Sequence, residues 1–550
     1  MSRFFYNDRD SLVDDAIAGI IASTPHHNLA RLDVDPSIRV VLRSDWDKGR
    51  VAVISGGGSG HEPAHAGFVG RGMLTAAVCG NLFASPSVEA ILHAIMALSG
   101  DRGCLLIVKN YTGDRLNFGL AAERARRYGL KIKMVIVADD IALPDNPQPR
   151  GLAGTVLVHK IAGYAAEQGK SLDEVHAIAQ SVCDNLFSIG AAIRSASLPG
   201  SHEPERIASG ETELGLGIHG EPGATTLRCE SARELIDTMV ERLEAACGDE
   251  GRLAVLLNNL GGTSELEMGV LAHALAESRL AGRIDLQIGP ATLVSSLDMK
   301  GFSITALRMK KTYCEALLAP VETSGWRAAI VPAPVAAIPH TRLSMALDYT
   351  PSDSPAIAGV VDSITRALIA SEKSLNTLDA KTGDGDTGST FAAGARDIAK
   401  LLQQQQLPLA EPALLLMLTG ERLAVVMGGS SGVLMSIFFT TAGQAVSEGA
   451  TLPDALLQGL AQMQHYGGAQ PGDRTLIDAL LPALESMKRG EPITQAAQAA
   501  RDGAQATAAM TRAGAGRSSY VNAANLKGVE DPGAAAIAAV FDSLAHGQKS

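Results

Sequence analysis

The sequence predicts a multidomain protein, in which an N-terminal α/β part is followed by an all-helical C-terminal part. Three observations carry this prediction. β-Branched runs alternate with helical stretches over residues 1–330, prolines crowd the stretch that follows, and strand signals almost vanish beyond it. At about 150 residues per domain, the 550 residues suffice for several well-buried cores.

The N-terminal part, residues 1–330, has the order of elements that is typical of α/β domains with mostly parallel strands. A polar stretch near 198–213, which contains Gly and Pro, predicts a boundary between two α/β subdomains. Loops at the carboxyl ends of such strands commonly carry the chemistry. The expected strands are 39–44, 51–55, 104–110, 131–140, 252–261 and 283–290, and the expected helices include 87–98 and 231–246.

Residues 331–355 predict a linker, because their closely spaced prolines resist both helix and sheet. The remainder, 356–550, has apolar residues at the helical period and predicts about eight helices joined by loops that contain glycine. The first helix is marked by the apolar face from Val360 to Leu368, and the others are expected at 392–402, 412–427, 432–448, 453–463, 474–487, 494–511 and 533–544.

Charge and cysteine content argue against several classes of protein. The 47 Lys and Arg are outnumbered by 59 Asp and Glu, which leaves a formal charge of −12. Without a basic cluster, binding to nucleic acid or to an anionic membrane surface is not expected. Six cysteines without a C-x-x-C pair argue against a disulfide framework and a thiolate zinc site. With a charged N-terminus and no long apolar run, the sequence predicts a soluble protein of the cytoplasm.

A glycine-rich loop, Ser55-Gly-Gly-Gly-Ser-Gly-His-Glu-Pro-Ala-His65, follows an expected strand. The dinucleotide pattern G-x-G-x-x-G fails, because its last position is His61, and the Lys-Ser/Thr pair of a P-loop is absent. Glycines here let backbone N–H groups approach a small polar ligand closely.

The same loop matches the H-E-x-x-H pattern of zinc peptidases through His61 and His65. That chemistry needs both histidines one turn apart on a stable helix. Pro63 and the glycines that follow leave room for only a very short helix. Two loop histidines, one of them buried, are therefore the simpler interpretation.

Two further loops hold polar candidates. Lys109 and Asp114 lie at the end of another expected strand and suit the hydroxyl and carbonyl oxygens of a ligand, although a surface turn with an ordinary ion pair has the same residues. His219 lies between glycines in Gly215-Leu-Gly-Ile-His-Gly-Glu-Pro-Gly223. A lone loop histidine is more often a solvated side chain than a catalyst, so both interpretations of His219 stay open.

The strongest local signal is an acidic cluster in the helical part. Asp379, Asp384 and Asp386 fall within eight residues, with two glycines between them. Such carboxylates repel one another, and Mg²⁺ or Ca²⁺ would relieve the repulsion because both ions prefer oxygen ligands. An EF-hand is excluded because no Glu stands at the twelfth loop position. The cluster predicts a metal–nucleotide site, with a solvated acidic loop as the alternative.

Glycine-rich turns precede several expected helices, at 428–432, 467–473, 514–517 and 531–533. N–H groups at a helix start can hold phosphate, although Ser430, Ser431 and Asp473 are also ordinary N-cap residues. Several such turns beside one acidic cluster favour a phosphate pocket.

Four motifs follow one another along the chain, at 55–63, 109–114, 217–222 and 379–386. Together they resemble the single-chain, ATP-dependent dihydroxyacetone (glycerone) kinases, most closely the bacterial enzymes of this length, and the resemblance extends over essentially the whole chain. It implies a substrate-binding α/β part, a nucleotide-binding helical barrel, and ATP and Mg²⁺ as cofactors. The implied reaction is the phosphorylation of dihydroxyacetone to dihydroxyacetone phosphate.

For the α/β part, the resemblance implies that His219 forms a covalent hemiaminal with the ketone carbon of dihydroxyacetone. Capture through a carbonyl selects ketones and aldehydes over glycerol, which has no carbonyl. His61 and Asp114 would help to activate the attacking hydroxyl. The implied substrate-binding residues are Gly58, Ser59, His61, Lys109, Asp114 and His219.

For the helical part, the resemblance implies that Asp379, Asp384 and Asp386 hold Mg²⁺ ions that bridge the phosphates of ATP. Related enzymes that use a phosphotransfer relay often carry His after the third Asp; Thr387 stands there in this chain, which suits the exchange of free ATP. A homodimer in which the domains of different subunits face each other is also implied. The implied nucleotide-binding residues are Asp386, Thr387, Gly388, Ser389, Ser430, Ser431, Gly468, Asp531, Pro532 and Gly533.

The motifs leave several alternatives open. Within the same family, D-glyceraldehyde or another short ketose or aldose is an alternative substrate. An added FAD-AMP lyase activity is a further alternative. Outside the family, the alternatives are a zinc peptidase that uses His61 and His65, and a sensor that binds a carbonyl ligand without catalysis.

Overall fold

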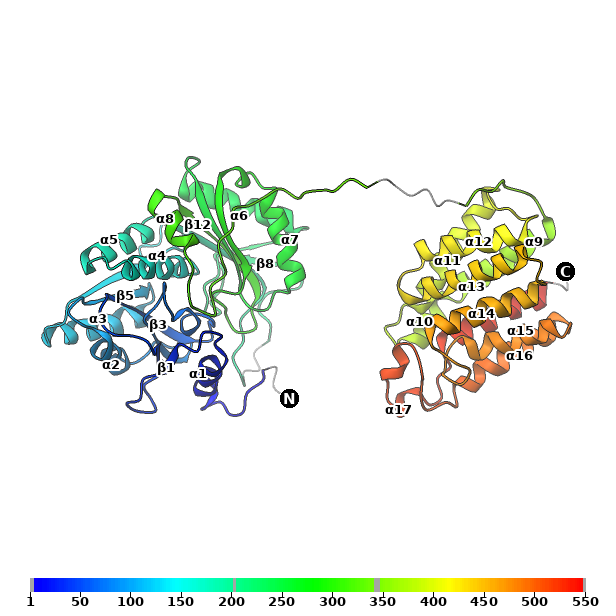
Figure 1. Cartoon of the computed structure of the whole chain (residues 1–550), viewed down its shortest axis with the longest axis horizontal. Coiled ribbons are helices and arrows are strands. Elements are labelled where there is room, and N and C mark those ends of the chain that lie inside the picture. Colours follow the sequence, from blue (N-terminus) through cyan, green and yellow to red (C-terminus); the bar gives the residue numbers. More distant parts are fainter. Residues whose placement is uncertain (1–3, 201–203, 341–346, 548–550) are drawn as a thin grey trace. The chain divides into compact units, whose positions relative to one another are not determined.

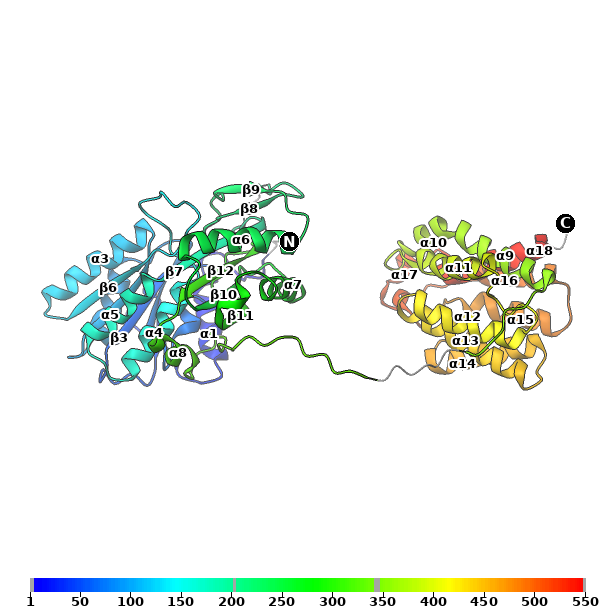
Figure 2. The same cartoon turned by 90° about the horizontal axis from the view of Figure 1, so that it is seen from above.

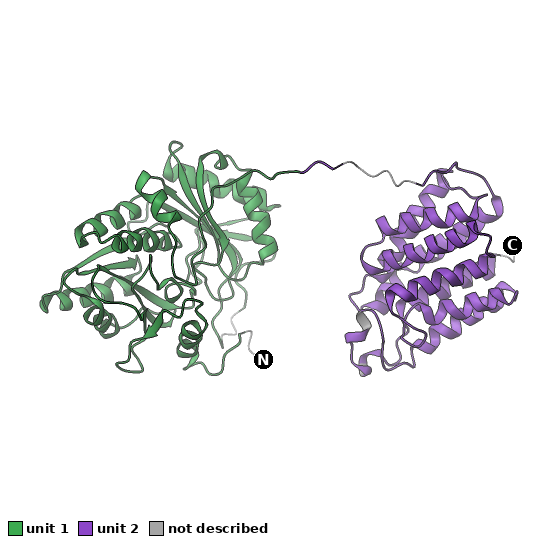
Figure 3. Cartoon of the chain, viewed as in Figure 1, with its two compact units in different colours: residues 1–337 green, residues 338–550 purple. Residues whose placement is uncertain are grey.

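The computed structural model of the chain describes residues 4–200, 204–340 and 347–547. It divides into two compact units, Met1–Ala337 (unit 1) and Ile338–Ser550 (unit 2), which Figure 3 colours separately. The division lies inside the expected linker 331–355, of which residues 341–346 are outside the described part.

The first sheet of unit 1 has six strands in the order β1-β2-β4-β3-β5-β6, of which Figure 1 labels β1, β3 and β5. The four strands from β4 to β6 in this order run parallel to their neighbours, as predicted, whereas β1 and β2 are added antiparallel at one edge. The strands are β1 (Leu29–Arg31), β2 (Val40–Arg43), β3 (Ala52–Ser59), β4 (Ala76–Leu82), β5 (Cys104–Lys109) and β6 (Ile132–Val137).

The second sheet has the order β11-β10-β12-β7-β8-β9, and only β10 and β11 are parallel neighbours. The prediction of mostly parallel strands is therefore wrong for this sheet, because β12 enters between β10 and β7 and runs against both. The strands are β7 (Leu186–Arg194), β8 (Thr212–Leu214), β9 (Thr225–Leu227), β10 (Leu253–Asn259), β11 (Ile284–Ala291) and β12 (Lys300–Arg308).

The change from one sheet to the other occurs before the predicted subdomain boundary. β7 already belongs to the second sheet and pairs with β8 and β12, so the described residues of the stretch 198–213 lie between β7 and β8 or within β8 itself. Residues 201–203 of this stretch are outside the described part. Its described residues therefore connect two strands of one sheet and do not separate two subdomains.

Alternate side chains of the strands pack on opposite faces. Ile54 of β3 packs with α2 and α3, whereas Val53 faces a core that both sheets share with α1, α4, α5 and α8. The outer face of the second sheet is covered by α6 and α7. The helices are α1 (Leu12–Ser23), α2 (Val88–Leu98), α3 (Thr112–Arg127), α4 (Thr155–Glu167), α5 (Leu172–Cys183), α6 (Ala232–Cys247), α7 (Glu265–Ala276) and α8 (Lys311–Leu318).

Unit 2 is all-helical in its described part, and its eight longer helices form a closed ring. Each contacts the next along the chain, and α18 returns to α9 (Figure 2). The prediction of about eight helices is confirmed, with short α10 (Glu372–Asp379) and α17 (Ala523–Leu526) in addition. The ring consists of α9 (Pro355–Ala370), α11 (Thr387–Gln403), α12 (Pro412–Val426), α13 (Gly429–Ser447), α14 (Leu452–Gly467), α15 (Ile477–Lys488), α16 (Ile493–Thr507) and α18 (Pro532–Gly547).

The apolar faces of these helices point into the ring, where they surround an apolar cavity of about 360 Å³. Its walls include Phe391, Leu423, Phe438 and Leu480 from four different helices. Across the described residues of both units, no helix combines the length and apolar character that crossing a bilayer requires.

Candidate active site

The expected substrate residues lie on three segments of unit 1. His61 follows β3, Lys109 is the last residue of β5, and Asp114 lies in the first turn of α3. These three side chains are buried. His219 comes from the second sheet, in the loop between β8 and β9, and is half-buried. The carboxyl ends of parallel strands and a loop of the other sheet thus build one site.

The imidazole of His219 stands in an aromatic cage. Its ring centroid lies 4.5 Å from that of Tyr111, 4.8 Å from that of His61 and 5.5 Å from that of Phe83. All three contacts are edge-on, with interplanar angles from 81° to 89°. His61 in turn stacks on Phe83 at 5.0 Å. The cage restricts the plane of the His219 ring and covers part of its surface.

The protonation state of His219 follows from this surrounding. Burial lowers its pKa to about 4, and the cations of Lys109 and Arg150 act in the same direction, against the carboxylate of Glu221. The imidazole is therefore neutral at neutral pH. A neutral imidazole nitrogen is the form that can attack a carbonyl carbon.

Arg150 anchors the loop that carries His219. Its guanidinium lies 2.7 Å from Asp140 and 3.3 Å from Glu221, and it donates to the carbonyl of Gly215 at 2.7 Å. Glu221 accepts the backbone N–H of His219 at 2.9 Å. Planar guanidinium groups can serve several acceptors at once, so one side chain holds both ends of the loop.

His61 and Asp114 each present a buried polar atom without a hydrogen-bond partner among the described residues: Nε2 of His61 and Oδ1 of Asp114. Nδ1 of His61 lies 2.9 Å from the carbonyl oxygen of Ser295, which only accepts, so Nδ1 carries the proton and Nε2 has a free lone pair. Leaving such atoms unpaired costs free energy unless a ligand meets them. Burial also raises the pKa of Asp114, which suits proton acceptance.

Lys109 is buried in the same site as His61 and Asp114. Burial lowers the pKa of its ammonium to about 8, although Asp114, Asp139 and Glu62 favour the charge. Its Nζ donates to Nε2 of His65 at 2.6 Å. The group remains a cation at neutral pH, available to a ligand oxygen.

The glycines after β3 permit close packing at this edge. A Cβ atom on Gly58 would lie 2.7 Å from the backbone nitrogen of Ala84 and 2.8 Å from the carbonyl carbon of Phe83. The Ser59 hydroxyl donates to the carbonyl of Gly80 at 2.8 Å and is turned toward β4. The proton of the Ser59 hydroxyl is thus committed to Gly80, and the hydroxyl can act toward a ligand only as an acceptor.

The zinc-peptidase interpretation is wrong. The His61–His65 segment forms turns that lead into a short 3₁₀ helix at Ala66–Phe68, so the two histidines do not share an α-helical face. Nε2 of His65 is occupied by the ammonium of Lys109. A zinc site of that class needs both imidazoles directed at one point.

The acidic cluster of unit 2 brings its three carboxylates together. One oxygen each of Asp379, Asp384 and Asp386 lies within 4.8 Å of the others, and the described residues contain no other group of three or more His, Cys, Asp or Glu side chains as close. Asp379 is buried at the end of α10, whereas the other two are exposed. Carboxylate oxygens are the donors that Mg²⁺ prefers, so the set fits this ion.

Asp379 also organises the loop that joins α10 to α11. Its Oδ2 accepts the backbone N–H groups of Gly385, Asp386 and Thr387 at 3.0–3.1 Å. A Cβ atom on Gly383 would lie 2.2 Å from Oδ1, so glycine is required there. The positive end of α11, which starts at Thr387, meets the acidic cluster.

The expected nucleotide residues lie at helix ends. Asp386–Ser389 open α11, Ser430 and Ser431 lie in the first turn of α13, Gly468 ends α14, and Asp531 precedes Pro532 and Gly533 at the start of α18. No capping side chain covers the start of α13, where Gly428 is the N-cap residue. Asp531 instead caps its own helix through the N–H of Ala534, and burial raises its pKa to about 6.

The ring topology places these ends together. Consecutive helices of an up-and-down bundle run in opposite directions, so α11, α13, α15 and α18 all begin at the end of the ring where α14 stops. Two contacts support this placement. The N–H of Asp531 donates to the hydroxyl of Thr507, the last residue of α16, and Gly388 packs against the carbonyl of Glu372, just after α9. Four helix starts and the acidic cluster therefore share one face of unit 2.

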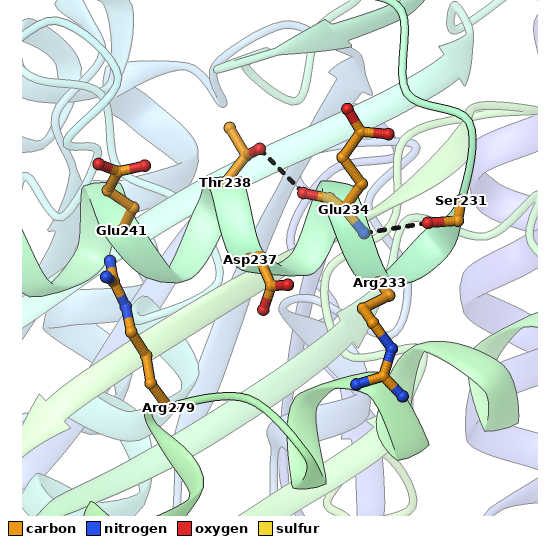
Figure 4. Close-up of a pocket in the computed structure, with 7 residues that line it drawn as sticks. All are labelled: Ser231, Arg233, Glu234, Asp237, Thr238, Glu241 and Arg279. Carbon is orange, nitrogen blue, oxygen red and sulfur yellow. Dashed lines mark hydrogen bonds between the residues drawn. The ribbon is translucent and has the colours of Figure 1, made fainter.

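A different pocket of unit 1, shown in Figure 4, contains none of the expected site residues. It lies on α6, and its side chains make local bonds: the Ser231 hydroxyl accepts the N–H of Glu234, and Thr238 donates to the carbonyl of Glu234. Arg279 pairs with Glu244. The pocket is a solvated face with helix caps and ion pairs, without a catalytic set.

Several residues of the site were not expected from the sequence: Tyr111 and Phe83 in the cage, and Arg150 and Glu221 at the His219 loop. Tyr111 lies between Lys109 and Asp114 in the 109–114 motif, so the sequence indicates its position near the site but not its contact with His219. Phe83 and Arg150 reach the site through tertiary contacts alone.

Comparison with known proteins finds a domain-family match in each of the two units. The Dak1 domain model matches residues 19–325, and the DAK2 domain model matches 381–546. The chain is 55% identical to the dihydroxyacetone kinase of Citrobacter freundii, over all of both chains, and 39% identical to human triokinase/FMN cyclase, over 99% of each. The crystal structure of the C. freundii kinase with AMP-PNP and Mg²⁺ aligns with a TM-score of 0.76 at 54% identity, covering 99% of this chain and 100% of that one. From the two domain matches and the full-length identity, this chain is a member of the Dak1–DAK2 family, to which the dihydroxyacetone kinase of C. freundii also belongs.

Proposed function

We propose that this chain phosphorylates dihydroxyacetone with ATP and yields dihydroxyacetone phosphate and ADP. The observation that carries the proposal is the neutral, caged imidazole of His219, which stands 4.8 Å from His61 in a site that also holds Lys109 and Asp114. The set suits a small carbonyl compound that also has hydroxyl groups. The 55% identical C. freundii relative is named for this activity.

In the proposed mechanism, a ring nitrogen of His219 adds to the ketone carbon, the carbonyl oxygen takes up a proton, and the other ring nitrogen gives up its N–H proton, so that a neutral hemiaminal results. The attacking hydroxyl oxygen then bonds to the γ-phosphorus of ATP while the bond to the bridging oxygen of ADP breaks. The hydroxyl proton passes to Oδ1 of Asp114 or to Nε2 of His61, two atoms without a hydrogen-bond partner in the described part of the chain. Lys109 would steady the second hydroxyl.

Asp379, Asp384 and Asp386 are proposed to hold Mg²⁺. The bound ion supplies charge neutralisation for the triphosphate, on which phosphoryl transfer depends more than on covalent chemistry by the protein. The uncapped start of α13 with Ser430 and Ser431 would offer N–H groups to phosphate. The remaining proposed nucleotide contacts are Thr387, Gly388, Ser389, Gly468, Asp531, Pro532 and Gly533.

We propose further that the protein acts as a cytoplasmic homodimer, in which the helical unit of one subunit serves the α/β unit of the other. Six unpaired cysteines suit a reducing compartment. Sedimentation of the purified chain tests the dimer, and a monomer at micromolar concentration with full activity contradicts it.

A second candidate keeps the chemistry and changes the substrate. The human relative is named triokinase/FMN cyclase, which favours tests with glyceraldehyde and with flavin nucleotides. The same pocket would accept other short ketoses or aldoses, since hemiaminal formation needs only a carbonyl group.

The test is ADP release by the purified chain with Mg-ATP and a panel of dihydroxyacetone, D-glyceraldehyde, a four-carbon ketose and glycerol, with FAD assayed separately. Dihydroxyacetone should give the highest kcat/KM and glycerol none. Mass spectrometry should find a dihydroxyacetone adduct on wild type that His219→Ala lacks. Absence of ADP release with every carbonyl substrate would contradict the proposal.

A further inference from the structure

Behind Lys109 lies a buried chain of polar side chains that the proposed mechanism does not use. Ser55 of β3 and His159 of α4 are fully buried, and His65 is 4% exposed. The imidazoles of His65 and His159 lie 5.2 Å apart between centroids, on either side of the Ser55 hydroxyl. Three polar side chains in a core require a structural or functional reason.

The proton positions in this chain follow from its two ends. The carbonyl oxygen of Ile107 only accepts, so the Ser55 hydroxyl must donate to it, at 2.7 Å. The Lys109 ammonium only donates, so Nε2 of His65 must accept from it, at 2.6 Å. The direction of the hydrogen bond at each end is thereby fixed, and no histidine tautomer has to be assumed.

The middle of the chain is then determined. Because Nε2 of His65 accepts, its proton resides on Nδ1, which donates to the Ser55 oxygen at 3.4 Å. The Ser55 proton is already given to Ile107, so Nε2 of His159 must be the second donor to that oxygen, at 3.1 Å. Ser55 therefore accepts the Nδ1 proton of the one tautomer of His65 that offers a lone pair to Lys109.

The acceptor end of this chain lies on the side of β3 that also faces Asp114, a proposed substrate residue. A Cβ atom built on Gly57 would lie 3.5 Å from Nε2 of His65 and 3.8 Å from Oδ2 of Asp114, so the same point of β3 faces both groups. A Cβ atom on Gly151 would lie 2.8 Å from that of Lys109, so the lysine stem is confined from the other side. The ammonium is held with two of its three hydrogens uncommitted to His65.

We infer that His65 is a positioning residue, whose acceptor tautomer is stabilised by Ser55 and which directs the Lys109 ammonium toward a substrate oxygen. The inference rests on the proposed function, since it names what holds a proposed substrate group. Protonation of His65 would place two cations 2.6 Å apart inside the core, and burial together with Lys109 keeps the His65 pKa well below its usual value.

Steady-state kinetics of four variants of the full chain test this role. His65→Leu removes the acceptor, and kcat/KM for dihydroxyacetone should fall roughly 10- to 100-fold, the loss expected for a hydrogen bond to a charged group. The KM for Mg-ATP should stay within about twofold. His65→Gln, whose amide oxygen takes the place of Nε2, should recover most of the loss.

Ser55→Ala should also lower kcat/KM for dihydroxyacetone, roughly 3- to 10-fold, because the buried Nδ1–H of His65 loses its acceptor. His159→Leu is the matched control: it deletes an equally buried imidazole that does not touch Lys109, and should change kcat/KM by less than about threefold. Equal losses in His65→Leu, His65→Gln and His159→Leu would mean a packing role and overturn the inference.

A spectrum of the wild-type chain serves as a second test where a His65 variant does not fold. NMR spectra of ¹⁵N-labelled histidine are recorded between about pH 6 and 8, a range around the ordinary histidine pKa. His65 should be neutral in them, with its proton on Nδ1. A proton on Nε2 overturns the inference. Absence of dihydroxyacetone-dependent ADP release by wild type is a different outcome, which rejects the proposed function while the tautomer result stands.

Discussion

The ring of His219 stands edge-on against the phenol ring of Tyr111, with centroids 4.5 Å apart and planes at 89°. Tyr111 precedes α3, whose first turn carries Asp114. The residue that limits the His219 ring is therefore a near neighbour in sequence of a proposed proton acceptor. Any shift of the Lys109–Asp114 segment would reach His219 through this contact.

Removal of the Tyr111 ring should impair the site without loss of the fold. Tyr111→Ala opens one wall of the cage, and kcat/KM for dihydroxyacetone should fall roughly 10- to 100-fold, since small misplacements of a reacting group are costly. Tyr111→Phe keeps the ring and is the control, with an expected change below about threefold. Equal activity of Tyr111→Ala and wild type would show that the cage does not orient His219.

The pH profile should have a plateau with two limbs. His219 has a pKa of about 4 and must be neutral to attack, so kcat/KM should fall only as the pH drops toward 4. Lys109 has a pKa of about 8 and loses its charge above it, so KM for dihydroxyacetone should rise on the alkaline side. Assays at saturating Mg-ATP and constant ionic strength measure both limbs. An acid limb near 6.5, the ordinary value for histidine, would contradict the buried neutral imidazole.

Arg150 should matter through the loop that it anchors. Arg150→Met breaks the bonds to Asp140, Gly215 and Glu221, and should slow adduct formation on His219 roughly 10-fold or more. Arg228→Met is the matched control, because Arg228 is an exposed arginine paired with Glu211, and its loss should cost less than about 1 kcal/mol of stability. Time-resolved mass spectrometry measures the rate of adduct formation on His219 in both variants.

Much of this architecture was predictable from local pattern. The parallel strands β3, β5 and β6 and most long helices of unit 2 lie within a few residues of their expected ranges. The second sheet was not predictable as mainly antiparallel, because β12 contains Gly301 and Ser303 among its apolar residues and owes its place to pairing with β10 and β7.

The site was predictable where chemistry is concentrated in a short motif. Asp379, Asp384 and Asp386 are close in sequence and close in space. Phe83 and Arg150 carry no local signal, because an aromatic residue after a strand and an arginine in a loop are common. Their roles arise from rings and acceptors contributed by distant segments.

The acidic residues should differ in their effect on stability although all three are proposed metal ligands. Asp379→Ala leaves three backbone N–H groups without their acceptor and should lower the free energy of unfolding of unit 2 by about 1–3 kcal/mol. Asp384→Ala, at an exposed position, should cost about 1 kcal/mol or less. Both should abolish Mg²⁺-dependent turnover. Thermal unfolding with and without Mg-ATP separates the two effects, and equal destabilisation would contradict the bracing role of Asp379.

Gly388 offers a test of the packing beneath the acidic cluster. A Cβ atom there would lie 2.1 Å from the carbonyl oxygen of Glu372 and 2.7 Å from Oδ1 of Asn376, so Gly388→Ala must push the start of α11 away. We expect a loss of about 1–3 kcal/mol in unfolding free energy and weaker binding of Mg-ATP, because α11 begins beside Asp386. Gly359→Ala is the matched control: it lies within α9 with nothing within 4 Å of the added atom, and alanine should stabilise that helix by about 0.5–1 kcal/mol. Calorimetry measures both quantities, and a Gly388→Ala chain as stable as Gly359→Ala would show that α11 has room to move without disturbing the metal site.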